Sequence, residues 1–146
     1  MKLDRNFEEF IRFLSGNAVR YLAVGGYAVA VHGHPRYTKD LDIWIDATPA
    51  NVARLLAALR DFGFGELGLS ERDFTTAGQV VQLGDPPHRI DLLTSLLGVD
   101  FETCYGTRYQ VKLGDTMIDF IDLDNLIKNK LATGRPQDRA DVDSLS

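Results

Sequence analysis

The chain has little of what marks a secreted, membrane-embedded or nucleic-acid-coating protein. Its single cysteine, Cys104, excludes an intrachain disulfide and fits a reducing compartment. No apolar run approaches the roughly 20 residues that a membrane-spanning helix requires. The N-terminal segment carries acidic side chains and lacks the apolar stretch of a signal sequence. We therefore expect a cytoplasmic protein without a membrane association.

The chain also lacks an excess of positive charge. The net charge of −5 argues against broad, sequence-independent binding to nucleic acid, which depends on many Lys and Arg contacts with phosphate. This net charge does not exclude an RNA substrate, because a local basic rim could hold one end of the RNA. The chain has 146 residues, of which 45% are hydrophobic and 25% charged. These values predict one globular domain, covering residues 1–146, with a substantial core.

The apolar pattern predicts an α/β domain, with one mixed sheet of about five to six strands and helices packed against it. Residues 63–77 are glycine-rich and carry no clear pattern. The last two helices form a short C-terminal element over about 122–146. Strands are expected at 21–24, 41–45, 80–83, 88–93, 109–113 and 117–121, and helices at 4–17, 27–32, 48–63, 123–133 and 137–145.

Two aspartates, one residue apart, open the predicted strand 41–45. Because side chains alternate along a strand, Asp40 and Asp42 point the same way and repel each other. Such a pair suits Mg²⁺, which typically takes one or two protein carboxylates plus substrate phosphates. Upstream, Gly25 and Gly26 lie at a strand-to-helix junction, where a backbone can approach a phosphate closely. This combination favours a metal-bound nucleoside triphosphate over the structural alternatives, a solvent-facing strand start and a tight turn.

Asp91, within the predicted strand 88–93, is the candidate third carboxylate. An acid in an apolar strand needs a partner, because an unpaired buried charge is costly. We expect Arg89 to point to the opposite face and to be a poor partner. Asp91 is then a third metal ligand or a general base, and the structural alternative is a salt-bridged core aspartate.

Basic residues follow in two places. In the loop 34–39, Arg36 can hold a phosphate bidentately and Thr38 can donate through its hydroxyl, although exposed basic loops are often without function. In the helix 123–133, Lys130 falls on the side predicted to be buried, where a lysine usually indicates a snorkelling stem or a specific anion. The predicted inward stripe of that helix consists of Leu123, Leu126, Ile127 and Leu131.

The last helix places Asp138 and Asp141 on the same face as its apolar residues. Acids are favoured near the N-terminal end of a helix, so capping is a serious alternative for Asp138 and a weaker one for Asp141. Arg135 is a candidate partner for either acid, and the sequence leaves its role open.

These motifs resemble those of the nucleotidyltransferase superfold, the polymerase-β-like and minimal nucleotidyltransferases. Gly25-Gly26 match the family's glycine pair, Asp40-Leu41-Asp42 its acidic doublet, and Asp91 its third carboxylate. Within the superfold, the chain is most similar to small bacterial proteins grouped with the AbiEii-type toxin nucleotidyltransferases. The shared strings are GGYAVAVHG-x-x-R-x-T-x-DLDI and a C-terminal K-x-A-x-G-R-x-x-D-x-x-D.

The resemblance implies transfer of a nucleoside monophosphate from an NTP to an acceptor hydroxyl, with Mg²⁺ or Mn²⁺ as cofactor. The implied metal ligands are Asp40, Asp42 and Asp91, which form the catalytic set together with Lys130. The residues implied to hold the nucleotide are Gly25, Gly26, Arg36, Thr38, Lys130 and Asp141.

The acceptor stays open at this point. The AbiEii likeness implies the toxin of a toxin–antitoxin pair that modifies tRNA ends, whereas the minimal nucleotidyltransferases allow protein or small-molecule acceptors. The competing class is a non-catalytic nucleotide- or partner-binding module that keeps the fold. The apolar residues of the first helix, Phe7, Phe10, Phe13 and Leu14, are the candidate surface for an antitoxin or a homodimer partner.

Overall fold

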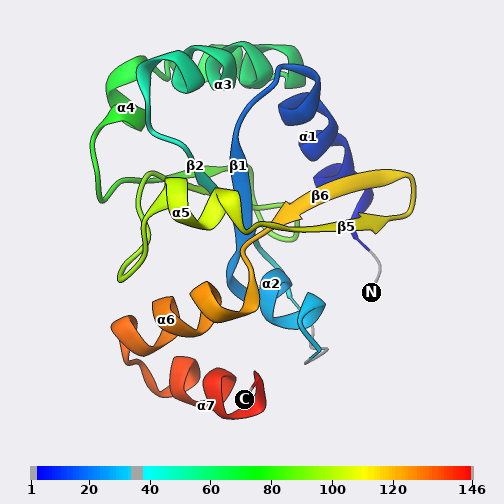
Figure 1. Ribbon diagram of the computed structural model, residues 1–146. Coiled ribbons are helices and arrows are strands. Elements are labelled where there is room, and N and C mark those ends of the chain that lie inside the picture. Colours follow the sequence, from blue (N-terminus) through cyan, green and yellow to red (C-terminus); the bar gives the residue numbers. More distant parts are fainter. Residues whose placement is uncertain (1–2, 34–37, 146) are drawn as a thin grey trace.

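The computed structural model describes residues 3–33 and 38–145, which form an α/β fold around one mixed six-stranded sheet (Figure 1). The order of strands across the sheet is β3-β4-β2-β1-β6-β5. The strands are β1 (Tyr21–Val24), β2 (Leu41–Ile45), β3 (Val80–Leu83), β4 (Ile90–Leu93), β5 (Tyr109–Leu113) and β6 (Thr116–Phe120). The predicted fold class and every predicted strand are thereby confirmed, with shifts of one or two residues at some ends.

The pairing of the strands brings three chain segments to one end of the sheet. The central strands β1 and β2 are antiparallel, so Val24 at the end of β1 pairs with Asp42 at the start of β2. β4 runs parallel to β2, which sets Asp91 opposite Asp42. The outer hairpins β3–β4 and β5–β6 are antiparallel, and β6 is parallel to β1. The C-terminal end of β1 and the acidic residues of β2 and β4 therefore lie at the same end of the sheet.

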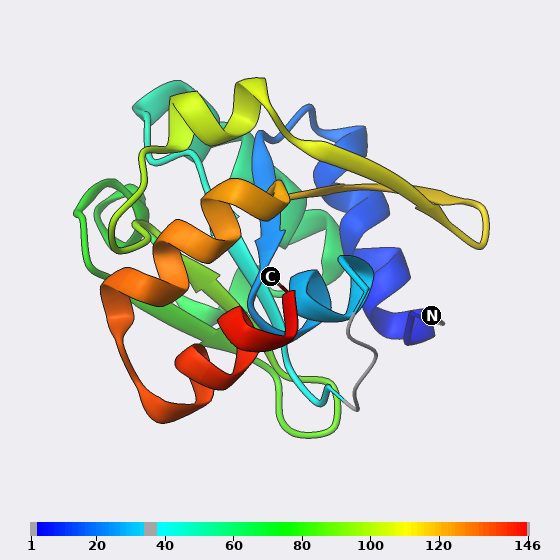
Figure 2. The ribbon, with the colours of Figure 1, turned by 60° about the horizontal axis from the view of Figure 1, so that its bottom comes forward.

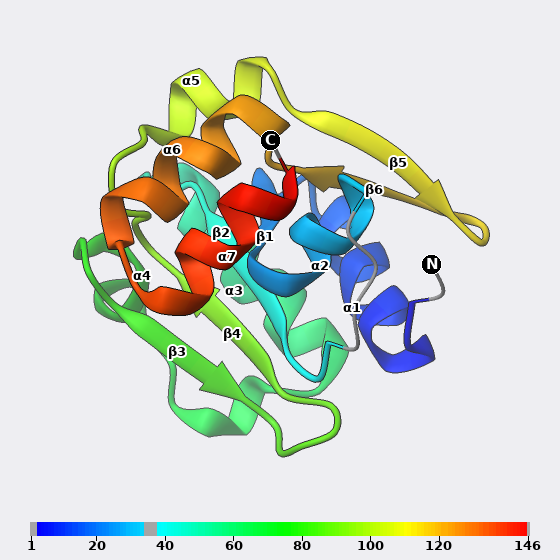
Figure 3. The same ribbon diagram turned by 90° about the horizontal axis from the view of Figure 1, so that it is seen from below.

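Helices cover both faces of the sheet. Figure 3 shows α1 and α3 on one side and α5 and α6 on the other, and α6 and α7 lie side by side beyond the ends of the central strands (Figures 2 and 3). None of the described helices is long and apolar enough to cross a membrane. The helices are α1 (Arg5–Gly16), α2 (Gly25–Val31), α3 (Pro49–Phe62), α4 (Glu71–Thr75), α5 (Phe101–Gly106), α6 (Leu123–Thr133) and α7 (Pro136–Leu145), with a 3₁₀ turn, η1, at Gly65–Leu67.

The apolar face of α1 belongs to the core. Phe7, Phe10 and Leu14 are each at most 1% exposed, and only Phe13 reaches the surface, where its ring packs edge-on against Phe62. The expectation that these residues form a partner-binding surface was therefore wrong. An amphipathic helix beside a sheet buries its apolar stripe in its own domain first, since this removes the most apolar area from water.

Two short helices were not expected from the sequence. α4 lies in the segment 63–77 and is fixed by a reciprocal capping box between Ser70 and Asp73, with Phe74 fully buried. α5 begins after Asp100, whose carboxylate accepts a hydrogen bond from the backbone N–H of Thr103. Both helices are too short to show a repeating apolar pattern, so only their caps signal them.

Candidate active site

The glycine elbow and the acidic strand are in contact at the end of the sheet. Gly25 has a φ of +66°, a conformation that L side chains rarely adopt. A Cβ atom at this position would overlap the carboxylate of Asp42, with the Asp42 Cγ only 3.0 Å away. Glycine is therefore required here both by the backbone conformation and by the approach of Asp42.

Three carboxylates gather beside this elbow. Asp42 faces Asp91 across the parallel strands β2 and β4, and Asp40 lies one residue before β2, on the same face as Asp42. Burial raises the pKa of Asp42 to about 7, and the negative charges of Asp91 and Asp40 add to this rise. The site thus holds a carboxylate whose charge is poorly compensated.

Arg89 is the cation of this cluster, contrary to the expectation that it points to the opposite face. Its Nε and Nη2 atoms donate to the two carboxylate oxygens of Asp91 at 3.1 and 3.0 Å, and Nη2 lies 3.2 Å from an oxygen of Asp40. The prediction was wrong because residues two apart on an extended chain share a face. Asp91 is consequently part of an ion pair as well as of the acidic cluster.

A cleft of about 590 Å³ opens over these acids. Its floor comes from the ends of the central strands and its two sides differ in chemistry. The side formed by α6 and the turn after it is polar, and the side formed by β3, β4 and the segment after β4 is largely apolar. The floor residues are Val24, Gly25, Asp42 and Asp91; the polar side has Asn129, Lys130, Thr133 and Arg135; and the apolar side has Val80, Leu93, Leu96 and Leu97, with Ser95 between them.

The polar wall exists because α6 turns a polar face inward. Lys130 is 6% exposed, as the sequence predicted, whereas Leu131 is 61% exposed, so its place on the inward stripe was wrong. The buried residues of α6 are Asn125, Leu126, Asn129 and Lys130. α6 packs against α7 and borders the cleft, where its polar side chains find hydrogen-bonding partners. Asn129 shows this, since its side chain donates to the carbonyl of Leu97.

α7 supplies the counter-charges for this wall. The Lys130 Nζ lies 3.2 Å from an Asp138 oxygen and 3.0 Å from an Asp141 oxygen, and both acids are almost fully buried. Burial alone would raise the pKa of Asp138, but hydrogen bonds from Arg135, Thr133 and Lys130 outweigh this effect and hold the pKa well below its usual value. Asp138 therefore acts as an ion-pair acceptor within the fold, which the capping alternative did not include.

The structure brings together only some of the residues proposed for the site. Four of them line the cleft: Gly25, Asp42, Asp91 and Lys130. Asp40 and Asp141 are not among the lining residues; Asp40 is paired with Arg89, and Asp141 with Lys130. Gly26 lies in the first turn of α2. Thr38, which is not among the lining residues, accepts a hydrogen bond from Tyr27 through its backbone carbonyl at 3.4 Å. Arg36 lies outside the described residues.

Sequence reasoning missed four polar members of the site and left a fifth open. Arg89 was assigned to the wrong face, and Ser95, Asn129 and Thr133 were not considered. Arg135, whose role was open, lines the cleft and donates to Asp138 at 2.7 Å. The spacing of Thr133 three residues after Lys130 was the available signal, because residues at i and i+3 share a helix face.

Whether a divalent ion fits can be judged from the donor set. Within residues 3–33 and 38–145, no three carboxylate, imidazole or thiol groups stand ready-made as a cage for a metal ion. The cluster is nevertheless rich in oxygen donors: when ionised, three carboxylates against the single Arg89 leave a charge of −2. Carboxylate oxygens beside a solvent-filled cleft are the ligands that Mg²⁺ uses together with water and phosphate, so the residues fit such an ion.

The fold has counterparts among solved structures. No protein-family model matches the sequence, and no curated protein sequence matches it significantly. A structure from Thermotoga maritima assigned as a nucleotidyltransferase aligns with 96% of this chain and 89% of its own, at 13% identity and a TM-score of 0.65.

Two further structures align with nearly the whole chain. The lincosamide antibiotic adenylyltransferase LnuA, in its lincomycin-bound form, aligns with 99% of this chain and 96% of its own at 14% identity and a TM-score of 0.57. An antigenic nucleotidyltransferase-like protein from Paracoccidioides brasiliensis aligns with 94% and 71%, at 16% identity and a TM-score of 0.57. The protein therefore has a nucleotidyltransferase-like fold.

Proposed function

We propose that this protein is a nucleotidyltransferase that moves a nucleoside monophosphate from an NTP to an acceptor hydroxyl and releases pyrophosphate. The observation that carries the proposal is the composition of the cleft. Two carboxylates, Asp42 and Asp91, lie on its floor, and the cations Lys130 and Arg135 lie on its polar side. Acids that hold a metal and cations that hold phosphate are the two requirements of this chemistry.

The proposed cofactor is Mg²⁺ or Mn²⁺, held by Asp42 and Asp91 with Asp40 beside them. When bound, the ion would supply positive charge to the attacking and leaving oxygens of an in-line displacement. The raised pKa of Asp42, about 7, reflects the same unmet demand for positive charge. The contact between Gly25 and Asp42 fixes where that carboxylate lies relative to the backbone elbow.

The remaining roles belong to side chains of the chain itself. Asp91 either completes the metal site or is the base that accepts the proton of the acceptor hydroxyl, and in either role Arg89 holds both of its oxygens in place. Lys130 and Arg135 would hold the triphosphate through charge-assisted hydrogen bonds; the support is that both line the cleft. Gly26, Arg36 and Thr38 keep their proposed triphosphate contacts on the strength of the shared sequence string.

At a finer level, we propose an AbiEii-type toxin of a toxin–antitoxin system that acts in the cytoplasm on an RNA or tRNA end or on a protein. The support is the pair of sequence strings shared with that group. A small-molecule acceptor is the alternative, because one structure with this fold is an antibiotic adenylyltransferase bound to lincomycin.

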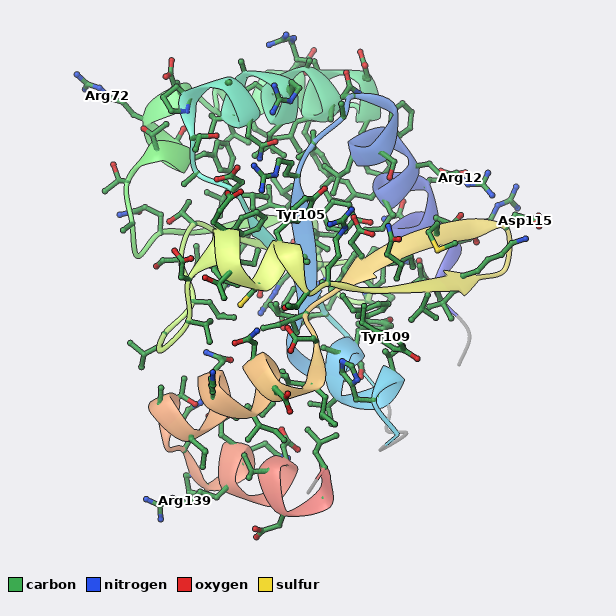
Figure 4. All side chains as sticks on the ribbon, viewed as in Figure 1. Arg12, Arg72, Tyr105, Tyr109, Asp115 and Arg139 are labelled. Atoms are coloured by element: carbon green, nitrogen blue, oxygen red, sulfur yellow. The ribbon has the colours of Figure 1, made fainter. Side chains whose placement is uncertain are left out.

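The decisive test is label transfer. The purified protein is incubated with each labelled ribonucleoside triphosphate, Mg²⁺ or Mn²⁺, and fractionated RNA, protein or aminoglycoside and lincosamide acceptors. We expect one acceptor to gain label with release of pyrophosphate. Asp42→Asn should abolish transfer, while Asp115→Asn, an exposed aspartate at the tip of the β5–β6 hairpin (Figure 4), should retain it. Full activity of the Asp42 variant would refute its assignment as a metal ligand.

The second candidate function, a non-catalytic nucleotide- or partner-binding module, is favoured by one observation. Arg89 already places a guanidinium among the acids, 3.0 Å from Asp91 and 3.2 Å from Asp40, in the manner of a resident counter-ion. Isothermal titration with each NTP and Mg²⁺ or Mn²⁺ separates the two classes. Binding without any label transfer, or no binding at all, would favour the module and direct attention to an antitoxin or homodimer partner.

A further inference from the structure

One buried aspartate collects every charged or hydroxyl donor of the polar wall. Asp138 is 1% exposed and is not among the residues that line the cleft. Its Oδ1 accepts from Lys130 Nζ at 3.2 Å, and its Oδ2 accepts from Thr133 Oγ1 at 2.5 Å. The Arg135 Nε donates to Oδ2 at 2.7 Å and Nη2 to Oδ1 at 3.3 Å. All three donors line the cleft.

Lys130 and Arg135 have more N–H groups than their contacts with Asp138 use. The Lys130 ammonium has three N–H groups; one donates to Asp138, and the ammonium also lies within ion-pair distance of Asp141. The Arg135 guanidinium has five, of which two point to Asp138. Lys130 and Arg135 balance the charges of the two aspartates, so the cations are stable in place before a ligand arrives. What the wall offers a ligand is a set of oriented donors.

We propose that Asp138 is a positioning residue that aims Lys130 and Arg135 at the phosphate groups of the nucleotide. The inference rests on the proposed function of the cleft. Lysine and arginine side chains lose considerable rotamer entropy when they are ordered. Because Asp138 holds both in the free protein, that loss does not have to occur when the nucleotide binds, and affinity rises accordingly.

The first experiment compares Asp138→Asn with a matched control. The substitution keeps the size of the side chain and removes its charge. Asp143→Asn makes the same change at an exposed position of α7. The dissociation constant is measured by isothermal titration for each of the four ribonucleoside triphosphates with Mg²⁺, alongside KM and kcat. Asp138→Asn should raise Kd and KM for the nucleotide about tenfold, with a smaller change in kcat, and Asp143→Asn should change none of them.

A double-mutant cycle separates positioning from mere support of α7. Arg135 is 73% exposed, so Arg135→Gln should fold normally, and Arg139→Gln, on the part of α7 that points away from the molecule (Figure 4), is its control. If Asp138 acts through Arg135, its substitution costs less nucleotide affinity in the Arg135→Gln background than in the wild type. Fully additive effects, or a folded Asp138→Asn protein with wild-type Kd, overturn the inference.

Two outcomes keep the test conclusive. If Asp138→Asn fails to fold, Thr133→Val is the substitute, because it removes one donor to the same carboxylate without changing any charge. The Kd of this variant for the nucleotide should rise about threefold, and an unchanged Kd overturns the inference. A wild-type protein that binds none of the four triphosphates refutes the proposed function and the inference with it. A wild type that binds, with variants that bind equally well, refutes only the role of Asp138.

Discussion

The substitution Asp42→Asn should stabilise the protein while removing its proposed activity. Asp42 sits among like charges: Asp91 faces it across two parallel strands and Asp40 precedes it on the same face. An asparagine has nearly the same shape and can hydrogen-bond to Asp91 without a negative charge. If the acids are assembled to hold a cation, their mutual repulsion lowers the free energy of unfolding, and this loss of stability is a consequence of the site's function.

The magnitude follows from the pKa of Asp42, which is 3.8 for an ordinary aspartate and about 7 in the folded protein. Since the folded state binds this proton more tightly than the unfolded state, its contribution to stability is present at low pH and is lost as the pH rises through about 7. A pKa difference of one corresponds to about 1.4 kcal/mol, so the full cost above pH 7 is at most about 4 kcal/mol. The substitution should recover most of it.

Trp44 provides the assay, because it is the only tryptophan of the sequence, is 2% exposed and lies two residues from Asp42 on the same strand. Urea unfolding is followed by its fluorescence in EDTA from pH 4 to 8. The wild type should lose stability across this range, whereas Asp42→Asn should not, and Mg²⁺ should stabilise only the wild type. A variant that is no more stable than the wild type at pH 8, or that gains equally from Mg²⁺, would refute the reasoning.

Three further predictions test other parts of the site. Gly25→Ala should lower the free energy of unfolding by about 1–2 kcal/mol, because φ at this position is +66°. It should also weaken Mg²⁺ binding in titration calorimetry, because the added Cβ displaces the Asp42 carboxylate; unchanged Mg²⁺ affinity would contradict this. Arg89→Gln should lower the melting temperature in EDTA and enlarge the stabilisation by Mg²⁺, since Asp91 loses its counter-ion; equal Mg²⁺ responses would contradict it. Because the pKa of Asp138 is held below its usual value, its charge contributes stability that is lost as the pH falls below about 4. Urea unfolding at several pH values should therefore show that the wild type is more stable than Asp138→Asn at neutral pH and that this difference shrinks on acidification; a difference that stays constant would contradict it.

Much of the fold could be predicted because its signals are local. The alternation of apolar residues in β2, the stripe of α1 and the cap and glycine stop of α3 each lie within one element. The prediction that Asp40 and Asp42 share a face needed only the geometry of an extended chain. α4 and α5 were not predicted, because one or two helical turns contain too few residues for an apolar pattern to repeat.

The site could be predicted only in part, because its partners come from distant segments. Lys130 was correctly expected to be buried, but the periodicity of α6 gave no means to choose between Asn129 and Leu131 as its inward neighbour. The choice depends on what covers that face, which is α7 with its buried acids. Similarly, the pairing of Arg89 with Asp40 joins residues almost fifty positions apart.

The amino-acid sequence by itself determined the strands and the longer helices, the acidic doublet and the glycine elbow, since each follows from backbone geometry over a few neighbouring residues. Only the tertiary structure decided that Asp91 stands opposite Asp42, that Arg89 pairs with Asp40 as well as with its near neighbour Asp91, and that Asp138 collects the donors of the polar wall. Strand order and helix docking set these contacts, and both result from burying the apolar surface of the whole domain, which no single segment encodes.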